Sequence, residues 1–244
     1  MVYHLYNKSI ADYTIFNNNV EFERIIQAIR YYQYLFEAKP STSLSYLIKR
    51  KIDTGNPVMG PCDTGGCAAK RKRNKLIEII AYCIMPTHLH LLVEELKKDG
   101  ISIFLRNILN SYTRFFNMRH NRKGPLWEGR TKRVEVKSDE QLYRVTRYIH
   151  LNPVTAYLVE KPEEWRYSSY KEFISDIKDS DRICKYEHLL DVEPNYYKKY
   201  VNDRISYQRE LAKIKHLLLE TPPQLRRLDN GLDQAQVQPT RLGR

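Results

Sequence analysis

The sequence predicts an α+β fold in which a four-stranded antiparallel sheet carries helices on one face. Two apolar runs separated by a short turn, at 76–84 and 88–93, indicate a hairpin at the centre of that sheet. Segments with helical spacing of apolar residues precede and follow the hairpin, at 21–36 and 101–117. Shorter strand-like runs begin and end the series, so the elements alternate as they do in two-layer α+β domains.

The first strand is expected over 2–7, a short run rich in aromatic residues, which favour strands. The asparagines at 17–19 follow a polar turn, and asparagine is a preferred N-cap residue. A helix with a single apolar face is expected to pack against the sheet. The helix predicted from Glu21 to about Phe36 has such a face, formed by Phe22, Ile25, Ile26, Ile29, Tyr32 and Leu35 or Phe36.

The central hairpin places two histidines at the start of its second strand, after the turn at 86–87. Because successive side chains of a strand point to opposite faces, His88 and His90 share one face of the sheet. The other face receives the leucines and the valine of 89–93. Two imidazoles on one face can bind a metal ion, but histidine is also an ordinary polar residue at a sheet edge. The pair alone leaves both interpretations open.

The remaining elements complete the series. Helical spacing over 101–117 is followed by the stretch 126–136, which is a loop that enters another strand. Ser138, Asp139 and Glu140 are expected to cap a helix that runs to Asn152 and must end before Pro153 or soon after it. Strand, helix, hairpin, helix and strand is the order of a ferredoxin-like sandwich. In that arrangement the histidine face stays free of the two packed helices, so the last helix can cross it.

The length of 244 residues suits one domain with appendages. The main domain is expected over 1–175. A Lys- and Arg-rich stretch over 37–75 reads as a flexible surface insertion, which is either a basic arm for DNA or a solvated loop. A helical extension is predicted over 176–221, and a polar, disordered tail over 222–244.

Two features indicate a reducing, cytoplasmic location. The chain has no apolar run of about 18 residues and no leader-like N-terminus, so neither a membrane span nor a signal peptide is expected. Its four cysteines are scattered, which favours free thiols. Cys62 and Cys67 stand close together but lack a second pair of ligands, so they are weak support for a zinc site.

The charge balance is strongly basic. Forty-one Lys and Arg against 29 Asp and Glu leave a net charge of +12, and 19 tyrosines are interleaved among them. Such a surface favours a polyanionic partner such as nucleic acid, although a merely soluble basic protein has the same composition.

The helix over 140–152 carries a row of polar side chains. Tyr148 and Asn152 are four residues apart and share one helical face, and Arg144 lies one turn further back. A phenol, a carboxamide and a guanidinium in a row suit an anionic phosphoryl substrate. Spacing alone does not select Tyr148 over Tyr143 or Tyr157.

A resemblance to a known family selects Tyr148, and four motifs carry that resemblance. They are PTHLHLLV at 86–93, LWEGR at 126–130, RYIHLNPV at 147–154 and WRYSSY at 165–170. In this order the chain, over about 2–173, resembles the single-tyrosine HUH transposases. The resemblance is greatest to the REP-associated tyrosine transposases, relatives of insertion-sequence transposases.

The resemblance implies a role for each motif residue. His88 and His90 would bind a divalent ion, Mg²⁺ or Mn²⁺, and Asn152 stands where relatives carry a polar third ligand. Tyr148 would be the nucleophile that cleaves and rejoins single-stranded DNA through a 5′-phosphotyrosine. The substrate implied is hairpin DNA of the REP type. The target sequence and the choice between monomer and dimer stay open.

A basic and aromatic cluster is expected to contact the DNA. Arg130, Lys132 and Arg133 can hold the backbone, together with Arg144, and Trp127 can stack on an extruded base. Trp127 equally fits the role of a core residue at the entry to a strand.

Two rival functions remain. One is a module that binds DNA hairpins without catalysis, which the intact set of His88, His90 and Tyr148 disfavours. The other is a metalloenzyme for small molecules, which needs a carboxylate beside its histidines. Glu94 and Glu95 are the nearest candidates.

Overall fold

The computed structural model describes residues 1–35, 44, 74–179 and 181–220, with side chains to residue 213. The predicted insertion lies almost wholly outside the described residues, as do Cys62 and Cys67. The predicted tail lies outside them entirely. No helix among the described residues is long and apolar enough to cross a bilayer.

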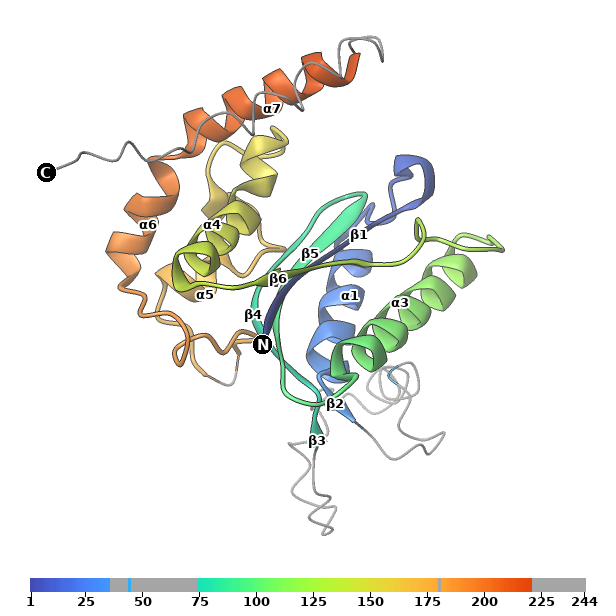
Figure 1. Ribbon diagram of the computed structural model, residues 1–244. Helices are drawn as coiled ribbons and strands as arrows, with labels where there is room; N and C mark the ends of the chain where they lie inside the picture. The colour runs from blue at the N-terminus through green and yellow to red at the C-terminus, as the bar shows by residue number, and fades with distance from the viewer. Residues whose placement is uncertain (36–43, 45–73, 180, 221–244) are drawn as a thin grey trace, which may run out of the picture.

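The sheet has the predicted number of strands. They are β1 (Val2–Lys8), β4 (Ile77–Ile84), β5 (His88–Glu95) and β6 (Lys132–Val136). Neighbours are antiparallel in the order β4-β5-β1-β6, so the hairpin pairs with the first strand (Figure 1). The predicted α+β class with a four-stranded antiparallel sheet is therefore confirmed. A short ladder of β2 (Tyr34–Leu35) and β3 (Asn74–Lys75) stands apart from this sheet.

Helices α1 (Asn19–Tyr32) and α3 (Gly100–Arg119) pack together on one face of the sheet (Figure 1). The Asn18 side chain caps α1 by accepting from a backbone N–H at 3.3 Å. The helix ends at Tyr32, earlier than the expected Phe36, because the chain turns into β2. The buried side of α3 follows helical spacing through Ile101, Phe104, Ile108, Tyr112 and Phe116.

Helix α4 (Asp139–Thr155) lies on the other side of the sheet and contacts β4 and β5 (Figure 1). Of the three residues predicted to cap it, Ser138 is the N-cap and accepts from the Gln141 N–H at 3.2 Å. The helix continues two residues beyond Pro153 before it ends. Its buried side turns Leu142, Thr146, Ile149 and His150 inward, so the sheet has helices on both faces.

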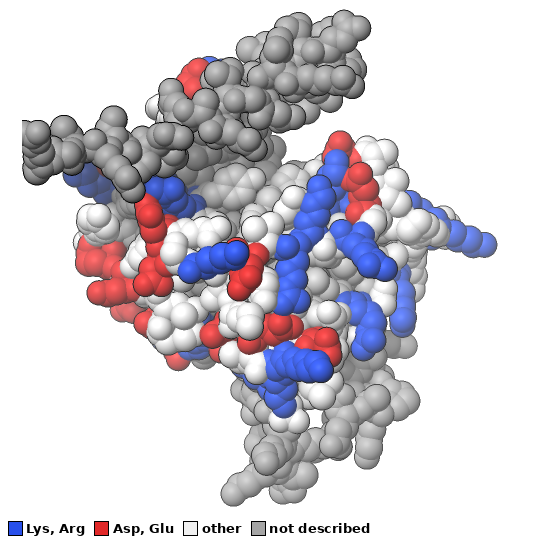
Figure 2. Space-filling view, in the orientation of Figure 1, with Lys and Arg blue, Asp and Glu red and all other residues white. Residues whose placement is uncertain are grey.

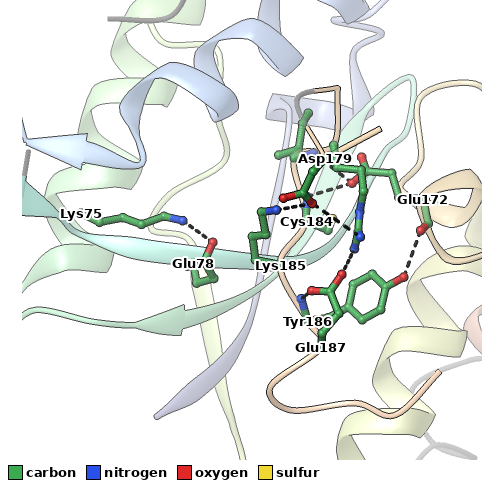
Figure 3. Close-up of polar contacts among 10 residues, drawn as sticks. Lys75, Glu78, Glu172, Asp179, Cys184, Lys185, Tyr186 and Glu187 are labelled. Atoms are coloured by element: carbon green, nitrogen blue, oxygen red, sulfur yellow. Dashed lines mark hydrogen bonds and ion pairs between the residues drawn. The ribbon is translucent and has the colours of Figure 1, made fainter. Parts of the chain in front are cut away.

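The segment after α5 (Tyr170–Ile174) runs along the free edge of β4. The backbone N–H of Lys185 donates to the Ile79 carbonyl at 2.8 Å. The buried Glu172 carboxylate accepts from the Cys184 N–H at 2.8 Å, and Tyr186 donates its hydroxyl to the Glu172 carbonyl at 3.0 Å (Figure 3). These bonds fasten the segment to the sheet and cover the outer edge of β4.

Four more helical segments complete the described chain. Two short 3₁₀ turns span Ile10–Asp12 and Pro162–Glu164. Helices α6 (Pro194–Asn202) and α7 (Ile205–Glu220) fall within the predicted helical extension and both contact α4.

Candidate functional site

Strand β5 presents His88 and His90 on the face of the sheet that α4 crosses. Their ring centroids are 5.1 Å apart and the ring planes are nearly perpendicular, at 86°. His90 is buried, and His88 is partly exposed. Leu89 and Leu91, on the opposite face, are fully buried in the core under α1 and α3. The strand alternation read from the sequence therefore holds.

Strand β1 adds two aromatic side chains to this face. Tyr6 pairs with His90 across the ladder, and the rings stack with centroids 6.0 Å apart. His4, two residues earlier on β1, also stacks against His90, with the two ring centroids 5.3 Å apart. The His4 Nε2 and His90 Nδ1 atoms are 3.1 Å apart, which is a hydrogen-bond distance.

Sequence reasoning missed His4 and Tyr6. Their spacing of two within a strand predicts that they share a face. Only the pairing of β1 with β5 puts that face beside the histidines, and this pairing joins residues more than 80 positions apart. A search for polar or aromatic pairs at spacing two in every predicted strand would have found them.

Helix α4 brings Tyr148 to the same place. Its ring stands edge-on to His90 at 5.7 Å and to His4 at 6.0 Å, measured between centroids. Tyr148 remains 40% exposed although it lies beside the imidazoles. A ligand can therefore reach it. Asn152, one turn later, donates its amide to the Tyr148 carbonyl at 2.9 Å.

The other two candidate tyrosines lie elsewhere. Tyr143 donates its hydroxyl to the Asp191 carbonyl at 2.7 Å, away from the sheet. Tyr157 follows the end of α4 and lies under the Arg209 guanidinium, 4.9 Å from its ring centroid. Of the three, Tyr148 is the one that contacts the histidine rings.

Burial sets the charge state of the imidazoles. It lowers the pKa of His90 well below the ordinary histidine value, and the neighbouring His88 and His4 lower it further. Burial also lowers the pKa of His88, and it lowers that of His4 to about 4. All three rings are therefore neutral near pH 7, which is the form in which imidazole binds metals.

The phenol is protonated at the same pH. Burial, and then the neighbouring Tyr6, raise the pKa of Tyr148, while a hydrogen bond from the Asn152 side chain acts in the opposite direction. As a nucleophile Tyr148 therefore needs a proton acceptor or a nearby cation.

The residues fit a divalent ion. The Nδ1 atom of His88 lies 3.0 Å from the Thr87 hydroxyl oxygen, and that of His90 faces His4, so both Nε2 atoms remain for a ligand. Coordinating histidines commonly have their second nitrogen engaged in this way. The described residues contain no group of three or more His, Cys, Asp and Glu arranged for a metal. A third protein ligand would thus be an amide or phenol oxygen, such as those of Asn152 and Tyr148.

The basic side chains predicted to bind DNA take different positions. Lys132 pairs with Tyr6 in the sheet and holds its ammonium 5.4 Å from that ring, on the histidine face. Arg133 points to the opposite face, over Tyr3 at 3.7 Å. Arg130 is exposed on the loop before β6. Figure 2 shows that lysines and arginines gather over β6 and α3.

Arg144 and Trp127 make contacts of their own. Arg144 forms an exposed ion pair with Glu140 on α4. Trp127 donates its indole N–H to the Thr113 hydroxyl at 3.1 Å, and its ring lies 6.0 Å from that of Tyr112. These are the contacts of a core residue, while base stacking by Trp127 stays a prediction.

The two carboxylates that a small-molecule metalloenzyme could use, Glu94 and Glu95, lie at the far end of β5. Glu94 contacts His188 at 2.8 Å, and Glu95 contacts Arg133 at 2.9 Å. Neither carboxylate contacts His88 or His90, so the arrangement disfavours a site of two histidines and one carboxylate.

Comparisons with known proteins agree with the motifs. Residues 65–152 match the family described as IS200-like transposases, a stretch that includes both histidines, Tyr148 and Asn152. A REP-associated tyrosine transposase of Haemophilus influenzae is 29% identical over 103 residues, which cover 38% of this chain and 58% of that protein. The match thus spans just over half of the relative's length.

A solved structure was also compared. It is that of a REP-associated tyrosine transposase bound to a REP hairpin, with a TM-score of 0.43, 15% identity, and coverage of 79% of this chain and 89% of the other. From the motifs, the family match and the curated relative, this chain is similar to the IS200-like transposases and, among them, to the REP-associated tyrosine transposases.

Proposed function

We propose that this chain cleaves and rejoins single-stranded DNA with Tyr148 as the nucleophile. The observation that carries the proposal is the position of the Tyr148 ring, edge-on to both His90 and His4 on the face of the sheet that α4 crosses. The family match over 65–152 supports the same reading, because it includes His88, His90, Tyr148 and Asn152.

The reaction follows from the residue types. The Tyr148 hydroxyl oxygen attacks the scissile phosphorus, so that a bond from this oxygen to phosphorus forms and the bond from phosphorus to the 3′-oxygen breaks. The phenolic proton leaves to solvent, and the departing 3′-oxygen takes up a proton. The products are a 5′-phosphotyrosyl protein and a free 3′-hydroxyl. Since the covalent link preserves the bond energy, a second 3′-hydroxyl can reverse the step without ATP.

His88 and His90, with the Asn152 amide oxygen, would hold a divalent ion. When bound there, Mg²⁺ or Mn²⁺ supplies a Lewis acid at the phosphodiester. Mixed nitrogen and oxygen ligands suit Mn²⁺ somewhat better than Mg²⁺. The residues themselves orient the substrate, and the Asn152 amide donates to the Tyr148 backbone carbonyl at 2.9 Å, which leaves its side-chain oxygen for the ion.

The proposed substrate is hairpin DNA of the REP type. This choice rests on the curated relative, a REP-associated tyrosine transposase, and on the net charge of +12. The position of Lys132 on the histidine face supports a contact with a phosphate of this DNA. Arg130 and Arg144 are exposed and would contact its backbone.

The test is to incubate the full chain with Mn²⁺ and a labelled single-stranded oligonucleotide that folds into a hairpin. A denaturing gel should show a band shifted by the mass of the protein. Tyr148→Phe should abolish this band and leave hairpin binding nearly intact, because phenylalanine keeps the ring. Tyr157→Phe is the matched control and should retain the band. A covalent band with Tyr148→Phe would refute the assignment, and binding without any band would leave a DNA-binding module.

A further inference from the structure

The contact between His4 and His90 joins the two central strands of the sheet. His4 Nε2 and His90 Nδ1 are 3.1 Å apart, and His4 and Tyr6 both stack against the His90 ring with interplanar angles of 21° and 26°. Leu5, which lies between His4 and Tyr6 in the sequence, is fully buried in the core and anchors the backbone of β1. The His90 imidazole therefore has little freedom to rotate.

One proton lies between these two nitrogens, and it can be carried by either ring. If His90 Nδ1 carries it and His4 Nε2 accepts, then His90 Nε2 has a lone pair. If His4 Nε2 carries it, the neutral His90 must hold its own proton on Nε2 and cannot bind an ion there. The partner of His90 Nδ1 thus decides whether the ring can be a ligand.

We propose that His4 is a positioning residue of the metal site, which accepts the His90 Nδ1–H and thereby keeps His90 Nε2 free for a divalent ion. The proposal rests on the metal site of the proposed function. His4 itself is not a ligand in this scheme, because its Nε2 is engaged with His90. Thr87 has the corresponding place at His88, with its hydroxyl oxygen 3.0 Å from Nδ1.

The experiment measures binding of Mn²⁺ alone to the full-length protein by calorimetry, without DNA. Loss of a hydrogen-bond partner behind a ligand typically costs about 10- to 100-fold in metal affinity, and we expect a loss of that size for His4→Ala. His4→Gln places a carbonyl oxygen near the position of Nε2 and should recover most of the affinity. His188→Ala, which removes an exposed imidazole at the other end of the sheet, should bind Mn²⁺ as the unmodified chain does.

A second measurement keeps the proposal testable if His4→Ala fails to fold. The ¹⁵N chemical shifts of the imidazoles in the unmodified, metal-free protein report which nitrogen of His90 carries the proton. A proton on Nδ1 is expected, and a proton on Nε2 would overturn the proposal.

The outcomes separate this inference from the proposed function. If His90→Ala loses Mn²⁺ binding while His4→Ala keeps it, the role of His4 is refuted and the metal site stands. If His90→Ala binds Mn²⁺ unchanged, the metal site itself is wrong, and the inference falls with it.

Discussion

At the scale of single residues, the proposed metal site depends on neutral imidazoles held in fixed positions. His88→Ala or His90→Ala should each abolish cleavage that depends on added metal, because one imidazole ligand is lost. Hairpin binding should persist, since neither ring belongs to the basic surface. Metal titrations of cleavage with each variant check this expectation, with His188→Ala as the control. Undiminished metal-dependent cleavage by either variant would place the ion elsewhere.

His150, two residues after Tyr148, links α4 to its neighbours. It is fully buried, with Nδ1 2.7 Å from the Tyr197 hydroxyl and Nε2 2.8 Å from that of Ser169. Burial lowers its pKa to about 3. Between about pH 6.5 and 3 the unfolded chain therefore holds a proton on this residue that the folded protein does not, so stability falls as the pH falls.

We expect His150 to contribute a loss of about 1.4 kcal/mol in the free energy of unfolding per pH unit within that window. His150→Gln removes the titrating group, and its stability should fall less steeply with acid than that of the unmodified chain. Urea unfolding of both proteins at several pH values measures the difference in slope. Equal slopes would show that His150 is protonated in the folded state.

At the scale of elements, Gly100 lets α3 begin close to the sheet. A Cβ at this position would lie 2.5 Å from the Leu76 carbonyl oxygen, which belongs to the backbone and cannot move aside freely. Although alanine is the better helix former, Gly100→Ala should lower the free energy of unfolding by about 1–3 kcal/mol through overpacking. Ser102→Ala, at an exposed position of the same helix, is the control. Thermal unfolding compares them, and a Gly100→Ala protein as stable as the control would contradict the clash.

The elements that the sequence predicts are those with local signals. The hairpin, the facing of His88 and His90, and the Ser138 cap all follow from periodicity or capping, and the structure has them. The end of α1 was predicted four residues too late, because pairing of β2 with β3 takes over from Tyr34. The position of His4 beside His90 was not predicted, because the register of β1 against β5 is set by packing between distant segments rather than by a local pattern.

At the scale of the whole molecule, two layers of helices enclose the sheet, and the segment after α5 covers the β4 edge. The opposite edge strand, β6, is mostly exposed and contributes Lys132. Figure 2 places basic side chains around this edge. For the proposed function, we therefore expect DNA to approach Tyr148 across β6.

Hairpin binding should therefore weaken steeply as salt increases, because phosphate contacts release counterions. Lys132→Ala should reduce the magnitude of the log–log salt slope by about 0.7–0.9, the value for one lost contact. Lys213→Ala, which removes an exposed lysine paired with Glu210 on α7, is the control and should leave the slope unchanged. Fluorescence anisotropy at several salt concentrations measures all three. An unchanged slope for Lys132→Ala would remove this residue from the DNA contact.

The proposed function depends most on the identity of the residue that becomes linked to DNA. Mass spectrometry of protease fragments, after reaction of the chain with a hairpin oligonucleotide and Mn²⁺, addresses it directly. We predict a nucleotide attached through its 5′-phosphate to Tyr148, which fragment spectra distinguish from Tyr157 in the same stretch of sequence. A nucleotide on another tyrosine, or no nucleotide on any fragment, would contradict the proposed function.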